Sequence, residues 1–171
     1  MPMSRTGRAA RRRSRLEPAR QDHPAVIVPP TVLYAIAFVA GLLIDWLIPK
    51  TIAAPATISP IGFAILAVGA LLAVWGRRTM EGAGTNLDPR LPVRSLVVSG
   101  PFRFSRNPLY VARTLLYVGL ALMMNTAWPL LALLPALVIV HYGVIRREEQ
   151  HLTTRFGAAY AQYQAQVRRW L

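Results

Sequence analysis

The amino-acid sequence predicts an all-α integral membrane protein with about four transmembrane helices. Apolar residues make up 54% of its 171 residues and charged residues only 16%, whereas soluble domains usually carry about 25% charged residues. The apolar residues also gather in long blocks separated by charged segments, as they do in membrane-spanning chains. A chain of this length suggests a single domain.

Residues 1–30 form a polar arm that contains seven arginines and ends in Pro29-Pro30. The two prolines would stop a helix that reached back from the first apolar block. The arm is too polar, and the block after it too long, for a cleaved signal peptide. We expect a disordered tail that touches anionic lipids.

The first predicted span covers residues 31–48, which carry a single charge, Asp45, near the far end. At that depth an aspartate is expected at the membrane interface. The second predicted span covers residues 61–76. Ser59 is a plausible N-cap for it, with Pro60 at the first helical position.

The second half of the chain holds two further spans and two polar segments. Arg77-Arg78 is predicted to close the second span, and a long polar connection follows over residues 77–108. The third span, residues 109–124, contains one arginine and is short for a full crossing, whereas the fourth covers residues 127–145. Residues 146–171 read as a charged helix with one apolar and aromatic side.

The distribution of charge predicts the topology. Arginines outnumber acidic residues by seven to two in residues 1–30, by seven to two in 77–113 and by five to two in 146–171. The two opposite turns carry almost nothing beyond Lys50. The positive-inside rule therefore predicts a multi-pass protein of a plasma membrane, such as the bacterial inner membrane, with both termini cytoplasmic.

Composition also excludes several function classes. The formal net charge of +13 could indicate a nucleic-acid binder, but the basic residues interrupt the spans and form no aromatic-studded platform, so no nucleic-acid partner is expected. The absence of cysteine excludes disulfides and a thiol nucleophile. The histidines, His23, His141 and His151, are too scattered to predict a metal site.

Polar residues converge on the predicted cytoplasmic face. Arg106 stands just before a turn at Asn107-Pro108, and His141 lies about two turns before Glu148, so that both side chains project in similar directions. Arg106 could equally mark topology and contact lipid phosphate, and the acidic pair could lie on a solvated helix surface. The residues by themselves allow an active site at this face without requiring one.

Two stretches nevertheless resemble the halves of one family signature. Residues 100–110, GPFRFSRNPLY, resemble the pattern G-P-[YF]-R-x-x-R-H-P-x-Y of the isoprenylcysteine carboxyl methyltransferase family, which is related to the membrane phospholipid N-methyltransferases. About forty residues later, Arg147-Glu148-Glu149 and the residues up to Tyr163 resemble its second half, R-x-E-E-x-x-L-x-x-x-F-G-x-x-Y-x-x-Y. The last residues, VRRWL, resemble the family's usual ending.

The resemblance implies an integral-membrane methyltransferase that uses S-adenosylmethionine, contains no Rossmann domain and takes a lipophilic acceptor from the bilayer. Arg106 and Glu148 are the candidate catalytic residues, which would orient the acceptor. The residues that would line the cofactor pocket, carried over by position, are Gly100, Pro101, Asn107, Pro108, Tyr110, His141, Arg147, Glu149 and Leu152.

The chain departs from the pattern at Asn107, where the family has histidine. Asparagine can donate and accept hydrogen bonds but cannot take up a proton near neutral pH. If the family's histidine performs acid–base chemistry at this position, this chain lacks that chemistry. If the position only holds the turn or a cofactor group, asparagine can fill the role.

The sequence does not decide the chemical class of the methyl acceptor. An isoprenylcysteine-like carboxylate is favoured, because it needs no deprotonation at neutral pH and an arginine could hold it. A phospholipid or other amine would need a proton removed, for which Glu148, Glu149 and His141 are candidates. A non-catalytic membrane scaffold of the same fold is the alternative from a different class.

Overall fold

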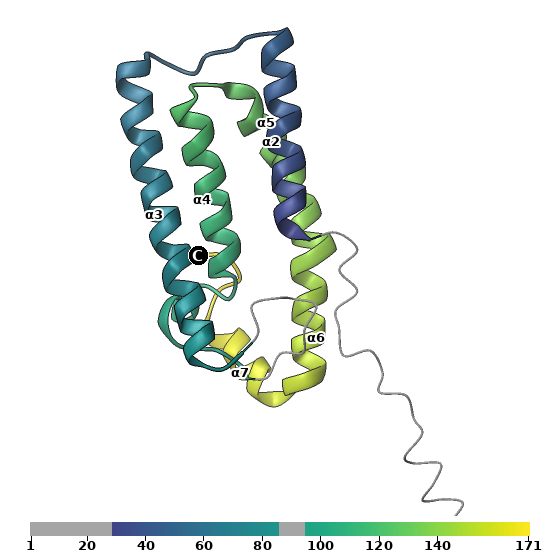
Figure 1. The fold of residues 1–171 in the computed structure, drawn as a ribbon. Coiled ribbons are helices and arrows are strands. Elements are labelled where there is room, and N and C mark those ends of the chain that lie inside the picture. Colours follow the sequence, from purple (N-terminus) through teal and green to yellow (C-terminus); the bar gives the residue numbers. More distant parts are fainter. Residues whose placement is uncertain (1–28, 86–94) are drawn as a thin grey trace, which may run out of the picture.

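The computed structural model describes residues 29–85 and 95–171, and all regular structure in these two stretches is helical (Figure 1). The predicted all-α fold class, without a Rossmann sheet, is confirmed. The predicted arm lies almost entirely outside the described residues, as does the middle of the 77–108 connection. The elements in chain order are α2 (Pro30–Leu47), α3 (Pro55–Gly82), the 3-10 helix η1 (Gly100–Arg103), α4 (Pro108–Met123), α5 (Ala127–Val140), the π-helix η2 (His141–Ile145), α6 (Arg146–Phe156) and α7 (Ala158–Gln166).

The long helices form two neighbouring pairs. Helix α3 lies along α4, and α2 lies along α5, with each pair antiparallel (Figure 1). Helices α2 and α3, and the continuous run from Ala127 to Phe156, are long and apolar enough to cross a membrane, whereas α4 is a shorter apolar helix. The chain is therefore a membrane protein, and α2, α3 and α5 expose many large apolar side chains, as helices in contact with lipid do.

Glycines allow α3 and α4 to approach closely. Gly62, Gly69 and Gly76 recur every seven residues on α3 and face α4. A Cβ atom added at Gly62 would lie 2.6 Å from the backbone nitrogen of Met123 and 2.8 Å from the backbone oxygen of Gly119. Small residues favour helix association in a membrane because they let two backbones pack against each other.

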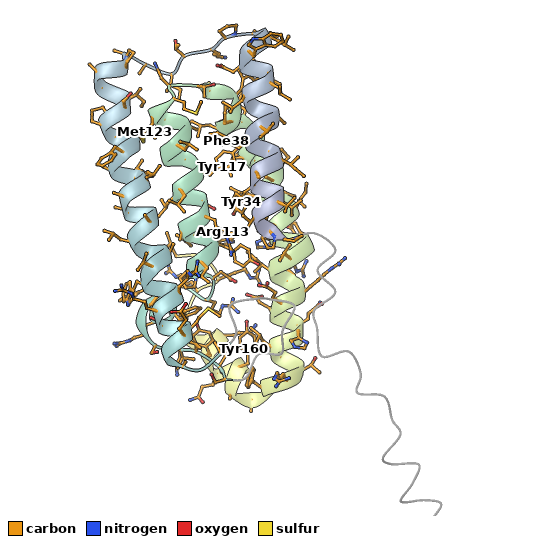
Figure 2. All side chains as sticks on the ribbon, viewed as in Figure 1. Tyr34, Phe38, Arg113, Tyr117, Met123 and Tyr160 are labelled. Carbon is orange, nitrogen blue, oxygen red and sulfur yellow. The ribbon has the colours of Figure 1, made fainter. Side chains whose placement is uncertain are left out.

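Aromatic side chains fill the space between the two pairs (Figure 2). The rings of Phe38 and Tyr117 pack edge-on with their centroids 4.9 Å apart. The Tyr34 hydroxyl lies 3.0 Å from the Thr114 hydroxyl, and the Tyr117 hydroxyl donates to the backbone oxygen of Pro129 at 2.8 Å. Each buried phenol therefore has a hydrogen-bond partner, as burial requires.

Helix α3 begins earlier than predicted, and the expected N-cap at Ser59 is wrong. The helix starts at Pro55, where the missing backbone N–H is one that the first turn does not use. Pro60 thus lies inside the helix and removes one backbone hydrogen bond. The Ser59 hydroxyl donates instead to the backbone oxygen of Met123 at 3.4 Å.

Helix α3 also ends later than predicted, because Arg77-Arg78 does not close it. Both arginines are exposed, and arginine is a good helix former, so the helix continues to Gly82. Gly84 then adopts a φ of 65°, a left-handed conformation in which glycine commonly ends helices.

The predicted single helix over residues 146–171 is likewise wrong, because the chain turns at Gly157. Its φ of 51° and ψ of −123° belong to a region that side chains with a Cβ atom avoid. The turn separates α6 from α7 and directs Tyr160 and Tyr163 into the protein, where both are buried.

Asn125, in the turn between α4 and α5, bonds the connection between α2 and α3. It has a φ of 53°, and its side chain bonds the connection between α2 and α3 at three backbone positions: Ile52 N at 3.1 Å, Ala53 N at 3.2 Å and Ala53 O at 2.8 Å. We expect Asn125→Ala to lower the free energy of unfolding by about 2 kcal/mol, because it strains the backbone and removes these bonds.

Thermal unfolding in detergent measures this change, and Asn125→Gly separates the two causes. Glycine accepts the positive φ but makes no side-chain bonds, so it should lose only about half as much stability. Equal stability of the alanine variant and the natural protein would contradict the assignment.

Candidate active site

Three distant segments meet at one end of the bundle. They are the turn before α4, the region from η2 to α6, and the last residues of the chain (Figure 1). Ser105 and Asn107 are buried in the turn, and Pro108 occupies the first turn of α4. The Asn107 backbone N–H donates to the Ser105 hydroxyl at 3.1 Å, which fixes the turn.

A π turn orients the side chains of the second segment. The Arg146 N–H donates to the backbone oxygen of His141, five residues earlier, so this turn takes one more residue than an α turn. The side chains that follow are delayed by about one position around the helix. His141 therefore shares a face with Glu149, and the expected alignment of His141 with Glu148 is not what the structure shows.

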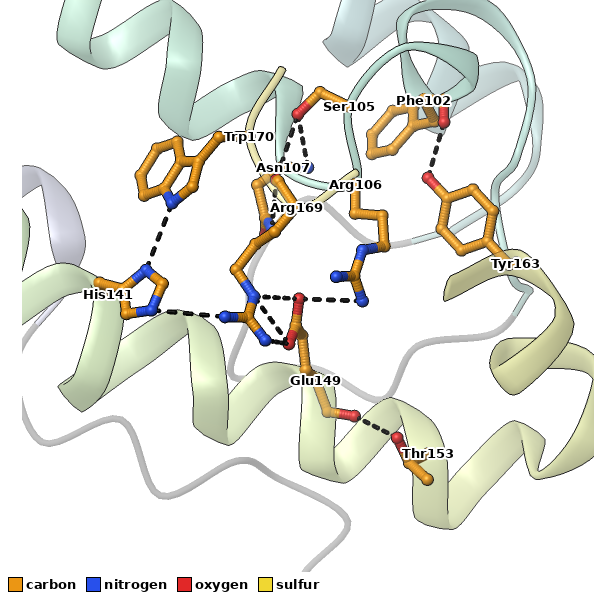
Figure 3. A network of polar contacts seen from close by, with 10 residues as sticks. All are labelled: Phe102, Ser105, Arg106, Asn107, His141, Glu149, Thr153, Tyr163, Arg169 and Trp170. Atoms are coloured by element: carbon orange, nitrogen blue, oxygen red, sulfur yellow. Dashed lines mark hydrogen bonds and ion pairs between the residues drawn. The ribbon is translucent and has the colours of Figure 1, made fainter. Parts of the chain in front are cut away.

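Glu149 is the centre of an ion-pair cluster (Figure 3). The Arg169 guanidinium grips its carboxylate with Nε at 3.0 Å from Oε1 and Nη2 at 2.7 Å from Oε2. Arg106 Nη1 lies 3.3 Å from Oε1, and the side chains of Arg106 and Glu149 are only 11% and 9% exposed. The bond to Glu149 raises the pKa of Arg169. Two arginines and one carboxylate leave the cluster with one surplus positive charge.

The last residues of the chain bind both halves of the site, and we call Arg169–Leu171 the C-terminal strap. The Asn107 side-chain amide donates to the backbone oxygen of Arg169 at 3.0 Å, and the Arg106 N–H donates to the backbone oxygen of Arg168 at 2.9 Å. The Trp170 indole N–H donates to His141 Nδ1 at 3.2 Å, and the planes of the two rings are 16° apart with centroids separated by 6.2 Å. The strap therefore links the turn before α4 to η2 and α6.

Glu148 belongs to a second polar contact on the neighbouring face. The Tyr110 hydroxyl donates to Glu148 Oε1 at 2.9 Å, and the Arg113 guanidinium lies 5.1 Å from the centre of the Tyr110 ring. The chain around the start of α4 is thus joined to α6 by two side-by-side polar pairs, Tyr110 with Glu148 and Arg106 with Glu149.

Helix α7 contributes two buried tyrosines, Tyr160 and Tyr163, and Tyr160 interacts with Arg106 of the cluster. Burial raises the pKa of Tyr160, although the nearby Arg106 guanidinium opposes this shift. Burial also raises the pKa of Tyr163, whose hydroxyl donates to the backbone oxygen of Phe102 at 2.7 Å. Both phenols are therefore protonated at neutral pH and serve as hydrogen-bonding packing groups.

An apolar groove of about 520 Å³ adjoins the cluster. Helix α4 forms one wall, α5 and η2 form the other, and Trp170 and Leu171 of the strap also line it. His141 also lines this groove, and its two ring nitrogens contact Arg169 and Trp170. The groove and the ion-pair cluster therefore share His141 as a common wall.

Most residues that the sequence singled out lie in this region. Those brought together at or beside the cluster are Arg106, Asn107, Pro108, Tyr110, His141, Glu148 and Glu149. Gly100 and Pro101 instead pack against α3, since a Cβ atom at Gly100 would lie 2.6 Å from the Thr79 hydroxyl. Arg147 is exposed and Leu152 half-buried on α6.

Sequence reasoning missed Ser105, Arg169 and Trp170. The ending VRRWL resembles the family's usual ending, but nothing in its spacing places Arg169 against Glu149, twenty residues earlier. The sequence signal that could have found Arg169 and Trp170 is their position at the chain end. The predicted topology places that end on the same cytoplasmic face as the other conspicuous polar residues.

A family model described as phospholipid methyltransferase matches residues 58–159, from α3 to the start of α7. The match includes both sequence half-motifs up to Phe156-Gly157 and leaves out the C-terminal strap. No curated protein and no solved structure gives a significant match to the chain.

Proposed function

The chain belongs to the phospholipid methyltransferase family of membrane methyltransferases, and from this membership we propose that it transfers a methyl group from S-adenosylmethionine to a lipophilic acceptor at the membrane surface. The family supports the broad reaction class, and members of this family generally use this cofactor. The charge bias of the sequence supports the cytoplasmic side of a bacterial inner or plasma membrane as the place of reaction.

The observation that carries the proposal is the contact between the ion-pair cluster and the apolar groove at His141. Methyl transfer requires a polar methyl donor and the acceptor atom to come within about 3–3.5 Å of each other. A polar cluster and an apolar groove that share His141 suit a polar methyl donor and a lipid acceptor that must meet.

The charges of the cluster suit the proposed cofactor. Bound S-adenosylmethionine would supply a methyl group on a positively charged sulfur, together with an amino-acid end that carries an ammonium and a carboxylate. Glu149 and Glu148 can face positive groups, while Arg106 and Arg169 can hold a carboxylate. Asn107 holds the strap through Arg169, so its place in the site requires no proton transfer.

Two acceptor types remain within this proposal. An isoprenylcysteine-like carboxylate is favoured by the first sequence motif and could be oriented by Arg106. A phospholipid amine is favoured by the family description, and Glu148, which lies beside the groove-forming helix α4, could take up its proton.

The first test is calorimetry of the detergent-purified protein with S-adenosylhomocysteine. Binding is expected, and a failure to detect it would contradict the methyltransferase proposal and leave a membrane scaffold. Lipid extracts incubated with labelled S-adenosylmethionine should then yield one methylated class, identified by mass spectrometry.

Glu148→Gln distinguishes the two acceptors. If the acceptor is an amine, loss of the base should slow turnover by about 100-fold with little change in S-adenosylhomocysteine affinity. If the acceptor is a carboxylate, turnover should change by less than about tenfold, because no proton needs to be removed.

A further inference from the structure

The two ring nitrogens of His141 both face hydrogen-bond donors. Trp170 Nε1 lies 3.2 Å from Nδ1, and Arg169 Nη1 lies 3.4 Å from Nε2 (Figure 3). The indole N–H and the guanidinium can donate hydrogen bonds but cannot accept them. A neutral imidazole has one donor nitrogen and one acceptor nitrogen, so it satisfies only one of these neighbours.

The Trp170 contact decides which nitrogen accepts. It is the shorter of the two, and the ring planes, only 16° apart, suit a bond from the indole N–H to the in-plane lone pair of Nδ1. The Nδ1 atom therefore carries the lone pair, and the proton of the neutral ring is on Nε2. A doubly protonated ring would place an N–H against the indole N–H and add a third positive charge beside Arg106 and Arg169.

The Nε2–H of His141 and the Nη1–H of Arg169 then point into the same space. Two donors cannot bond each other, but one oxygen placed between them can accept from both. Arg106 adds to the surplus of donors, since its buried Nε has no hydrogen-bond partner within the described part of the chain. The cluster also carries one surplus positive charge, which favours an oxygen that is negatively charged.

The space next to His141 Nε2 and Arg169 Nη1 is accessible to a ligand. The Arg169 side chain is 34% exposed, and His141 is half-buried and lines the apolar groove. Glu149 grips the Nε and Nη2 atoms of Arg169, so that Nη1 is the atom left to face His141. Asn107 holds the backbone of Arg169 from the other side.

We propose that His141 Nε2 and Arg169 Nη1 form a subsite for an anionic oxygen of a bound ligand, a carboxylate or phosphate oxygen. Trp170 and Asn107 act as positioning residues, because Trp170 sets the tautomer of His141 and Asn107 sets the place of Arg169. The subsite deepens the proposed function and rests on it, and the oxygen belongs either to the amino-acid end of the cofactor or to the headgroup of the acceptor.

The first experiment observes the subsite without relying on activity. Nitrogen-15 NMR of histidine-labelled protein in detergent, with His141 assigned through His141→Asn, should show the neutral ring protonated at Nε2. Trp170→Phe should remove this preference. Inorganic phosphate should shift the His141 signals in a saturable way that is lost in Arg169→Ala. A proton on Nδ1, or no response to phosphate, would overturn the proposal.

The second experiment identifies the source of the oxygen. Calorimetry compares S-adenosylhomocysteine with methylthioadenosine, which keeps the nucleoside and the thioether but lacks the amino-acid end. If the cofactor supplies the oxygen, Arg169→Ala should weaken S-adenosylhomocysteine binding by about 10- to 100-fold and leave methylthioadenosine unchanged. If the acceptor supplies it, S-adenosylhomocysteine affinity should stay constant and the KM for the acceptor should rise by a similar factor.

Arg168→Ala is the matched control, because it removes the same charge from the neighbouring residue, whose side chain is exposed. Arg169→Lys keeps the positive charge but loses the forked geometry of the guanidinium. Its affinity or KM should therefore lie between the values for Arg169→Ala and Arg168→Ala. If Arg169→Ala matched Arg168→Ala in both affinity and KM, the proposal would be wrong. A natural protein that binds no S-adenosylhomocysteine would defeat the proposed function, and the phosphate titration would still decide the subsite.

Discussion

Replacing Glu149 with glutamine is expected to reduce methyl transfer by about 100-fold or more and to lower the free energy of unfolding by about 3 kcal/mol. The substitution leaves Arg106 and Arg169 next to each other without their shared negative charge. Arg106 is nearly buried, so water cannot compensate it. Removing one partner of a buried ion pair costs far more than the pair itself contributes.

Turnover of labelled cofactor and thermal unfolding in detergent measure the two effects. Gln150→Ala is the matched control, since it changes the next residue on α6, whose side chain is exposed. It should alter neither quantity. Glu149→Asp keeps the charge on a shorter side chain and should retain more stability than activity. Turnover of Glu149→Gln within a factor of about three of the natural protein would rule out a central role for this carboxylate.

Replacing Gly62 with valine is expected to lower the free energy of unfolding by about 3 kcal/mol and to reduce the yield of folded protein. The new Cβ atom would lie 2.6 Å from the Met123 backbone nitrogen and 2.8 Å from the Gly119 backbone oxygen. These are backbone atoms of α4, so the whole helix must move to relieve the clash. The start of α4 carries the Arg106 turn, and the movement should therefore also weaken S-adenosylhomocysteine binding.

Gly82→Ala provides the control on the same helix, because in the described part of the chain no atom beyond the neighbouring helix backbone lies within 4 Å of the position that its Cβ would take. Alanine favours helix over glycine, so this variant should be unchanged or more stable by up to about 1 kcal/mol. The midpoint of thermal unfolding in detergent compares the two. If Gly62→Val unfolded at the same temperature as Gly82→Ala, the close packing of α3 against α4 would not contribute to stability.

The sequence predicted the helices well because hydrophobicity and length are local properties. The run that became α4, predicted as residues 109–124, differs from Pro108–Met123 by one residue at each end. Asn125 lies between the predicted spans 109–124 and 127–145, and in the structure it adopts a positive φ in the turn that joins them. The start of α3 was missed because Pro55 and Pro60 both fit a first turn, and only the observed fold shows which one begins the helix.

The sequence predicted only part of the arrangement of the candidate site. Arg106, Glu148 and Glu149 were placed at one face by helix length and charge, and the structure brings their segments together. Which glutamate faces which partner depends on the π turn at His141–Ile145, since one extra residue brings Glu149 to the direction that Glu148 would otherwise take. No residue type in that turn predicts a π-helix.

The sequence by itself determined that this chain is a helical membrane protein of a methyltransferase family with its polar residues concentrated toward one side. Apolar runs must bury their backbone groups in helices within lipid, and charge is excluded from the lipid interior. Only the tertiary structure decided that Arg169 and Trp170 enter the site and that Glu149 pairs with Arg106. These contacts join residues between 20 and 43 positions apart, and they depend on helix register and on the path of the chain end, which local patterns do not encode.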